Sequence, residues 1–127
     1  GVGDVDISAL VDFHKGHGKT ATLTGVYPPG RFGELGTEDG VVASFNEKPQ
    51  VSGGHINGGF FVLEPSVIDL IEEDSTVWEQ GPLRQLAASG RLSAYRHDGF
   101  WQPMDTLADK QKLEQLWASG NAPWKVW

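Results

Sequence analysis

The chain has 127 residues, of which 39% are hydrophobic and 21% charged, and its formal net charge is -7. These proportions are typical of a globular protein and exclude a disordered chain or a coiled coil, while the negative charge argues against nucleic acid or an anionic membrane as the main partner. The absence of cysteine excludes disulfides, thiol nucleophiles and zinc-thiolate sites. No apolar run approaches the roughly 20 residues that span a bilayer. No Pro/Gly/Ser-rich linker divides the chain, so we expect one unit over residues 1–127, and the lack of cysteine fits a cytoplasmic protein.

Helical and strand-like patterns alternate along the chain. Asp6 is a good N-cap for a helix that begins at Ile7 and ends at the glycines at 16 and 18. The run 56–63 has almost no polar residue after Asn57, which predicts a central strand buried on both faces. Further strands are expected over 20–27, 41–47 and 92–97, with helices over 66–71, 82–88 and 107–119. The alternation predicts an α/β fold with a mainly parallel or mixed sheet flanked by helices.

Three segments place polar groups at predicted strand ends, where α/β sheets bind ligands. In the first, Glu47 and Lys48 leave a strand together and Pro49 ends it. The Lys48 ammonium suits a phosphate, and the Glu47 carboxylate can accept hydrogen bonds from sugar hydroxyls. The alternative is a solvated ion pair at a strand end, which contributes little to stability.

The second segment surrounds Asn57 with four glycines. Glycine lets the backbone approach a ligand closely, and the Asn57 amide offers the donor and the acceptor that a sugar hydroxyl needs. The alternative is a turn or bulge with Asn57 in a left-handed conformation. The neighbouring His55 fits a surface loop residue better than a catalyst.

The third segment places Asp105 beside the expected start of the last helix. Asp105 is a candidate Mg²⁺ ligand, because this hard cation prefers carboxylate oxygen and shares itself with substrate phosphates. The alternative is that Asp105 or Thr106 is simply the N-cap of that helix. A weaker fourth segment, around Arg31, brings the Gly33 backbone near a ligand or forms a surface turn.

These segments occur in the order and spacing found in the sugar-phosphate nucleotidyltransferases, and the chain resembles that family over essentially its whole length. Within the family it looks most like the enzymes that act on CTP and glucose-1-phosphate, a likeness that extends to the tryptophan-rich tail. The segments that carry the family resemblance are Arg31-Phe32-Gly33, Glu47-Lys48-Pro49, Ile56-Asn57-Gly58-Gly59 and Trp101-Gln102-Pro103-Met104-Asp105-Thr106.

The resemblance implies the C-terminal half of a Rossmann-like nucleotidyltransferase domain. It assigns Lys48 to the sugar phosphate, Asp105 to Mg²⁺, and the glucose to a set of groups that comprises Glu47, Asn57 and the backbone of Gly33 and Gly58. Such enzymes join CTP and glucose-1-phosphate into CDP-glucose and pyrophosphate, a step toward bacterial surface polysaccharide, and a homo-oligomer is implied.

The family's glycine-rich triphosphate loop has no match in this sequence, and its first metal aspartate would lie just before Gly1. The resemblance therefore implies a fragment that carries the sugar-phosphate side of the active site and is inactive alone. The alternative is a non-catalytic sugar-phosphate-binding or assembly module. An unrelated α/β structural domain would require four ordered matches by accident.

Overall fold

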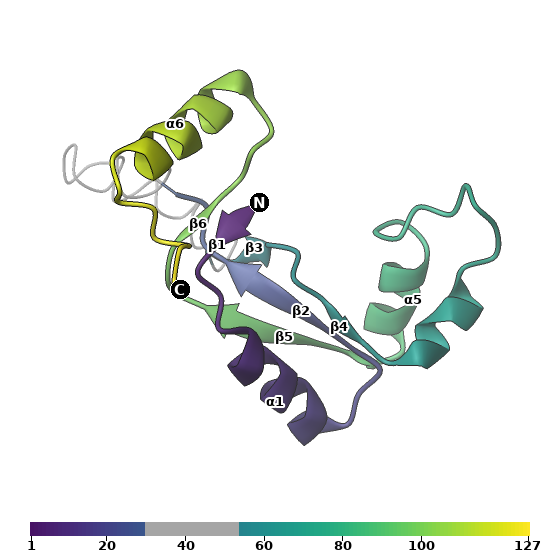
Figure 1. Ribbon diagram of the computed structural model, residues 1–127. Helices are drawn as coiled ribbons and strands as arrows, with labels where there is room; N and C mark the ends of the chain where they lie inside the picture. The colour runs from purple at the N-terminus through teal and green to yellow at the C-terminus, as the bar shows by residue number, and fades with distance from the viewer. Residues whose placement is uncertain (30–53) are drawn as a thin grey trace, which may run out of the picture. The chain divides into compact units, whose positions relative to one another are not determined.

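The structure is a computed structural model that describes residues 1–29 and 54–127 (Figure 1). Contacts divide the chain into two compact units, which are Gly1–Val5 with Gly25–Gly58 and Arg96–Trp127, and Asp6–Thr24 with Gly59–Tyr95. We call them the β1–α6 unit and the α1–α5 unit. The described elements are β1 (Val2–Gly3), α1 (Ile7–His17), β2 (Ala21–Val26), β3 (Ile56–Asn57), β4 (Val62–Leu63), the 3-10 helix η1 (Pro65–Leu70), α5 (Pro82–Ala88), β5 (Leu92–His97), β6 (Trp101–Gln102) and α6 (Leu107–Ala118).

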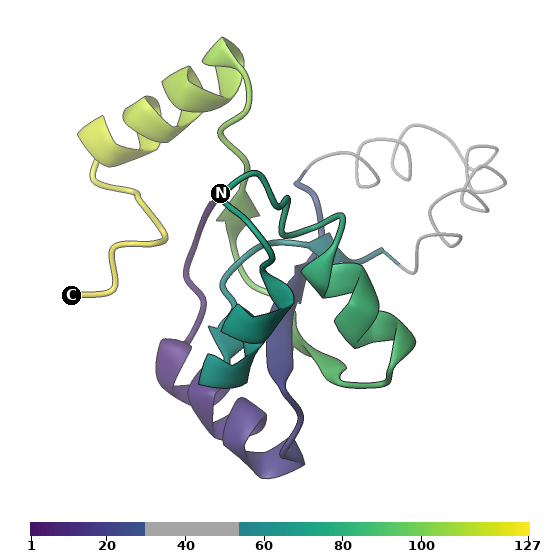
Figure 2. The same ribbon diagram turned by 90° about the vertical axis from the view of Figure 1, so that its right-hand side faces the viewer.

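The α1–α5 unit has helices on both faces of β2. Successive side chains of a strand point to opposite faces. Ala21 packs with Val67 and Leu86 of η1 and α5, whereas Thr22 bonds to His14 of α1. Figure 2 shows α1 and α5 on either side of this strand. The unit is therefore a helix–sheet–helix sandwich, as the sequence pattern predicts.

The strands around β2 form a mixed sheet. β4 pairs antiparallel with β2, with Ala21 opposite Leu63. On the side of β5, the Ala21 N–H donates to the carbonyl of Arg91 (3.1 Å), so β2 and β5 begin at the same end and run in the same direction (Figure 1). The predicted α/β class with a mixed sheet is confirmed.

The β1–α6 unit contains short strand pairs and the last helix. β1 pairs antiparallel with β6, with Val2 opposite Gln102 and Gly3 opposite Trp101. The end of β2 pairs antiparallel with β3, with Gly25 opposite Asn57. The segments around Asn57 and Trp101 both belong to this unit.

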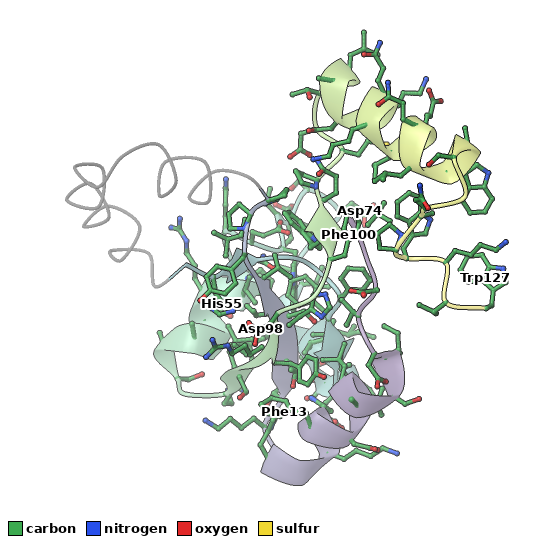
Figure 3. The ribbon with its side chains drawn as sticks, turned by 90° about the vertical axis from the view of Figure 1, so that its left-hand side faces the viewer. Phe13, His55, Asp74, Asp98, Phe100 and Trp127 are labelled. Carbon is green, nitrogen blue, oxygen red and sulfur yellow. The ribbon has the colours of Figure 1, made fainter. Side chains whose placement is uncertain are left out.

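The C-terminal tail packs through one tryptophan. Trp124 lies against Phe100 and stacks on Trp117 of α6, with ring centroids 5.9 and 6.4 Å apart. Trp127 is 79% exposed (Figure 3). Aromatic burial therefore fixes the tail as far as Trp124 and does not extend to its last residue.

The predicted strand over 56–63 is wrong, because it is interrupted. β3 and β4 are separated by a turn in which Gly59 and Phe60 have φ values of 85° and 48°. The left-handed region is incompatible with a continuing strand. Both residues of β3 are exposed, and the buried strand is β2. The predicted strand over 41–47 lies outside the described residues.

Candidate functional site

The structure describes three of the six residues predicted for the site. Asn57 is the last residue of β3 and pairs with Gly25 near the end of β2, and Gly58 follows it. Asp105 lies between β6 and α6. All three belong to the β1–α6 unit. The other three, Gly33, Glu47 and Lys48, lie outside the described residues.

The segment at Asn57 is extended and closely packed on one side. Asn57 is exposed in β3 and has no left-handed conformation, so the turn interpretation of this asparagine is wrong. Gly58 is buried, and a Cβ there would lie 2.6 Å from Val26, closer than real Cβ contacts. Its carbonyl accepts a hydrogen bond from the indole N–H of Trp101 (3.2 Å). Packing thus demands glycine at 58 and leaves the Asn57 amide at the surface.

Asp105 is not the helix cap. Thr106 is, because its side chain accepts from the N–H of Asp109 (3.1 Å) while the Asp109 carboxylate accepts from the N–H of Thr106 (3.2 Å) and of Asp105 (3.1 Å). The hydrogen bond from the Asp105 backbone is the first cause that lowers the pKa of Asp109. The Asp105 carboxylate is exposed and has no hydrogen bond or ion pair with any residue in the described part of the chain.

Gln102 ties the Asp105 segment to the strand before it. Its side chain is 3% exposed, and its amide nitrogen donates to the Asp109 carboxylate (3.1 Å) and to the carbonyl of Pro103 (3.3 Å). Its own backbone pairs with Val2 in β1. The turn that carries Asp105 is therefore fixed from both sides, by β6 and by α6.

The residues around Asp105 can supply part of a Mg²⁺ coordination shell, namely one free carboxylate. Mg²⁺ is commonly bound through one or two carboxylates, with waters and substrate phosphates completing its shell. Asp105 supplies one such carboxylate, whereas Asp109 is committed to the helix start. Within residues 1–29 and 54–127, no three His, Asp or Glu side chains are grouped to hold a metal on their own.

His55 belongs to a surface cluster that organises the strand ends. Its ring lies on that of Tyr27 with centroids 4.0 Å apart, and its Nε2 lies 3.3 Å from Asp98 (Figure 3). Arg96 donates to the same carboxylate oxygen (3.1 Å), and this hydrogen bond is the main cause that lowers the pKa of Asp98. His55 is thus a packed and paired residue, in line with the non-catalytic interpretation.

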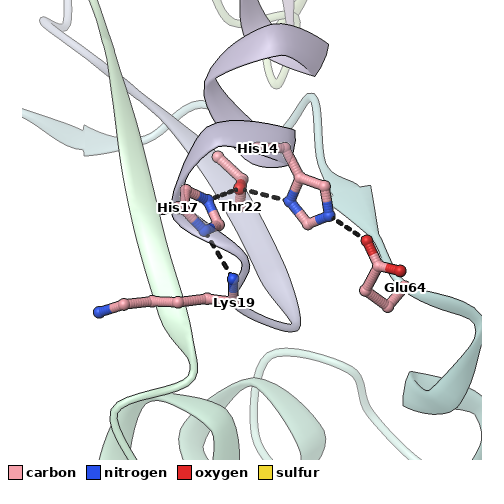
Figure 4. Close-up of polar contacts among 5 residues, drawn as sticks. All are labelled: His14, His17, Lys19, Thr22 and Glu64. Carbon is pink, nitrogen blue, oxygen red and sulfur yellow. Dashed lines mark hydrogen bonds and ion pairs between the residues drawn. The ribbon is translucent and has the colours of Figure 1, made fainter.

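A second polar cluster lies inside the α1–α5 unit (Figure 4). The Lys19 N–H donates to Nδ1 of His17 (2.8 Å), so in the neutral ring the hydrogen sits on Nε2 and is donated to the Thr22 hydroxyl (2.6 Å). The hydroxyl hydrogen in turn finds its acceptor in Nδ1 of His14 (2.7 Å), whose Nε2 donates to Glu64 (2.6 Å). Each donor in this series of hydrogen bonds therefore has one acceptor.

This cluster has the residue types of a nucleophilic triad but not its access. Thr22 is fully buried and His14 is 3% exposed, so no substrate can reach the hydroxyl. Burial is the first cause that lowers the pKa of His17, which agrees with a neutral His17 ring. The cluster holds α1 on the sheet. No local signal in the sequence points to Glu64, which lies 50 positions from His14.

Comparison with known proteins supports the resemblance to sugar-phosphate nucleotidyltransferases. The chain is 64% identical over 127 residues to glucose-1-phosphate cytidylyltransferase of Salmonella typhi, and 41% identical over 128 residues to a probable glucose-1-phosphate cytidylyltransferase of Bacillus subtilis. The chain is a relative of the sugar-phosphate nucleotidyltransferases. It is also 33% identical over 135 residues to the mannose-1-phosphate guanylyltransferase catalytic subunit beta of Dictyostelium discoideum. No family model matches the chain.

The extent of these matches is uneven. The first two alignments cover 100% of this chain but 49% and 50% of the relatives, and the third covers 93% of the chain and 38% of its relative. The chain thus spans about half the length of the cytidylyltransferases that it matches. The resemblance to nucleotidyltransferases is confirmed along the whole chain. In the described part of the chain, no helix has the length and apolar character to cross a membrane.

Proposed function

We propose that this chain forms the sugar-phosphate side of a glucose-1-phosphate cytidylyltransferase. The observation that carries the proposal is the 64% identity along all 127 residues to an enzyme of that name. The segments that bear the family's motifs lie within this alignment, and Asn57, Gly58 and Asp105 fall in one compact unit. The substrates of the complete enzyme are then CTP and glucose-1-phosphate.

The surroundings of Asp105 support its role as a metal ligand. Its carboxylate is exposed, and the turn that carries it is fixed by β6 and by α6. Mg²⁺ commonly binds through one or two carboxylates together with substrate phosphates, and its charge would offset the repulsion between the two polyanionic substrates.

The residues of this chain would mainly bind and orient. A phosphate oxygen of glucose-1-phosphate forms the new bond to the α-phosphorus of CTP while the bond to pyrophosphate breaks, so no covalent protein intermediate is needed. Lys48 would hold the sugar phosphate, and Asn57, Glu47 and the backbone of Gly33 and Gly58 would hold the glucose hydroxyls. Fixing two reactants in line is itself a large part of catalysis in such reactions.

A hybrid enzyme tests the proposal. In the Salmonella typhi cytidylyltransferase, the aligned residues are replaced by this chain, and pyrophosphate release is measured with CTP, glucose-1-phosphate and Mg²⁺. We expect turnover that requires both substrates. A folded hybrid without turnover would overturn the proposal.

The 127-residue chain alone is the matched control. Its sequence has no match to the family's triphosphate loop, so it should release no pyrophosphate above background but should bind glucose-1-phosphate in a calorimetric titration. Robust turnover by the chain alone would show that the nucleotide side is also present. Absence of glucose-1-phosphate binding, with an inactive hybrid, would leave no support for a sugar-phosphate role.

A further inference from the structure

Trp101 contacts two other segments of the β1–α6 unit. Its indole N–H donates to the carbonyl of Gly58 (3.2 Å), although the two residues are 43 positions apart. Its ring lies against the start of β1, where a Cβ on Gly1 would come within 2.6 Å of Nε1 and one on Gly3 within 3.3 Å of Cδ1. The two glycines leave the space that the indole occupies.

The hydrogen bond fixes the backbone directly after Asn57. The Cα of Gly58 packs against Val26, whose methyl groups would lie 2.6 and 2.7 Å from a Cβ at this position. Gly58 therefore contacts a strand of the sheet through its Cα and the indole of Trp101 through its carbonyl. β6, which carries Trp101, leads within four residues to Asp105, so the indole links the Gly58 carbonyl to the strand that precedes the Asp105 turn.

We propose that Trp101 is a positioning residue for the sugar phosphate. It acts through Gly58: its N–H holds the Asn57–Gly58 backbone at a fixed place relative to β6 and the Asp105 turn. The proposal rests on the proposed function. It concerns the N–H donor and not the bulk of the ring, and this distinction makes it testable.

Two replacements separate the donor from the ring. Trp101→Phe removes the N–H and part of the ring, and site-specific replacement of Trp101 by benzothienylalanine keeps two fused rings and removes only the donor. Trp117→Phe is the matched control, because Trp117 is 53% exposed in α6 and packs on Trp124, away from Gly58. Each variant is made in the hybrid enzyme, and its fold is checked by circular dichroism.

Loss of the donor should weaken binding of the sugar phosphate. A neutral hydrogen bond contributes modestly, so we expect the KM for glucose-1-phosphate to rise about 3- to 10-fold in both Trp101 variants. The KM for CTP should change less than about twofold, and Trp117→Phe should change neither constant. In the 127-residue chain, the indole N–H signal that disappears in Trp101→Phe should shift when glucose-1-phosphate is added.

Every result decides the matter. If the benzothienylalanine enzyme keeps the wild-type KM for glucose-1-phosphate, the positioning role is wrong even though the hybrid is active. Equal changes for both substrates would show a general structural role instead. An inactive wild-type hybrid, with no glucose-1-phosphate binding by the chain, would overturn the proposed function and this inference together.

Discussion

Thr22→Val is the perturbation for which the structure gives the clearest expectation. Valine has nearly the shape of threonine, so the sheet packing around this fully buried position is kept. The hydroxyl that joins the two imidazoles is lost. Its contacts to Nδ1 of His14 and Nε2 of His17 measure 2.7 and 2.6 Å.

The magnitude follows from what the two rings can do afterwards. Nδ1 of His14 is left buried and unpaired, which costs about 1–3 kcal/mol, whereas the half-buried His17 can turn to water and loses about 0.5–1.5 kcal/mol. Removing the hydroxyl also removes the free-energy cost of burying it, which offsets part of this loss. We expect a decrease of about 2 kcal/mol in the free energy of unfolding, equivalent to about 6–10 °C in Tm for a chain of this size.

Urea denaturation at neutral pH measures the effect, with Thr24→Val as the control. Thr24 is also fully buried in β2 and makes one side-chain bond, to the carbonyl of Phe60 (2.9 Å), so its loss should cost about 1 kcal/mol. If Thr22→Val costs no more than Thr24→Val, the chain of donors through Thr22 is not what secures α1. A cost below about 0.5 kcal/mol would refute the reasoning outright.

Three further expectations concern the proposed site and its support. Asp105→Asn in the hybrid enzyme should remove most activity but change stability by less than about 0.5 kcal/mol, whereas Thr106→Ala should lower stability by about 1 kcal/mol in urea denaturation. Lys48→Met should raise the KM for glucose-1-phosphate about 10- to 150-fold and that for CTP much less, and equal effects would remove Lys48 from the site. The pKa of Asp109 is lowered from 3.8 in the folded chain, so its contribution to stability is present above that value and is lost as the pH falls through the folded pKa. In Asp109→Asn, the urea midpoint should therefore fall less steeply at acid pH.

The helices and strands whose ends are marked by proline, glycine or a capping residue were predictable from the sequence. α5 and β5 match the predicted ranges 82–88 and 92–97, because Pro82 suits the first helical turn and Gly90, with φ 72°, ends it. α1 begins after Asp6 and ends before the left-handed Gly18 as predicted. Proline, glycine and capping residues act within a few positions, so single-sequence reasoning can use them.

Most of the features that the sequence did not reveal depend on contacts between residues far apart in the chain. The run 56–63 is apolar enough for a strand, but period alone cannot show that Phe60 takes a left-handed conformation. That conformation is accompanied by a tertiary contact, the bond from the Thr24 hydroxyl to the Phe60 carbonyl. The bond from Trp101 to Gly58 spans 43 positions and likewise leaves no local pattern. β1 and β6 were missed for a simpler reason, because each has two residues.

Asp105 and Asp109 show why the same residue type in one segment cannot be assigned from sequence alone. Asp105 lies just before the predicted helix over 107–119 and Asp109 lies in its first turn, and the residue type alone does not say which of them supports the helix start and which is left for a ligand. The structure separates them through hydrogen bonds: Asp109 accepts from two backbone N–H groups and from Gln102, which stabilises its charge where it lies. The same bonds hold the Asp105 turn in place while leaving its carboxylate exposed to a ligand. The hydrogen bonds of Asp109 thus support the proposed metal site. Asp109→Asn should weaken Mg²⁺ binding indirectly, by loosening the turn that carries Asp105, whereas Asp105→Asn removes the ligand itself.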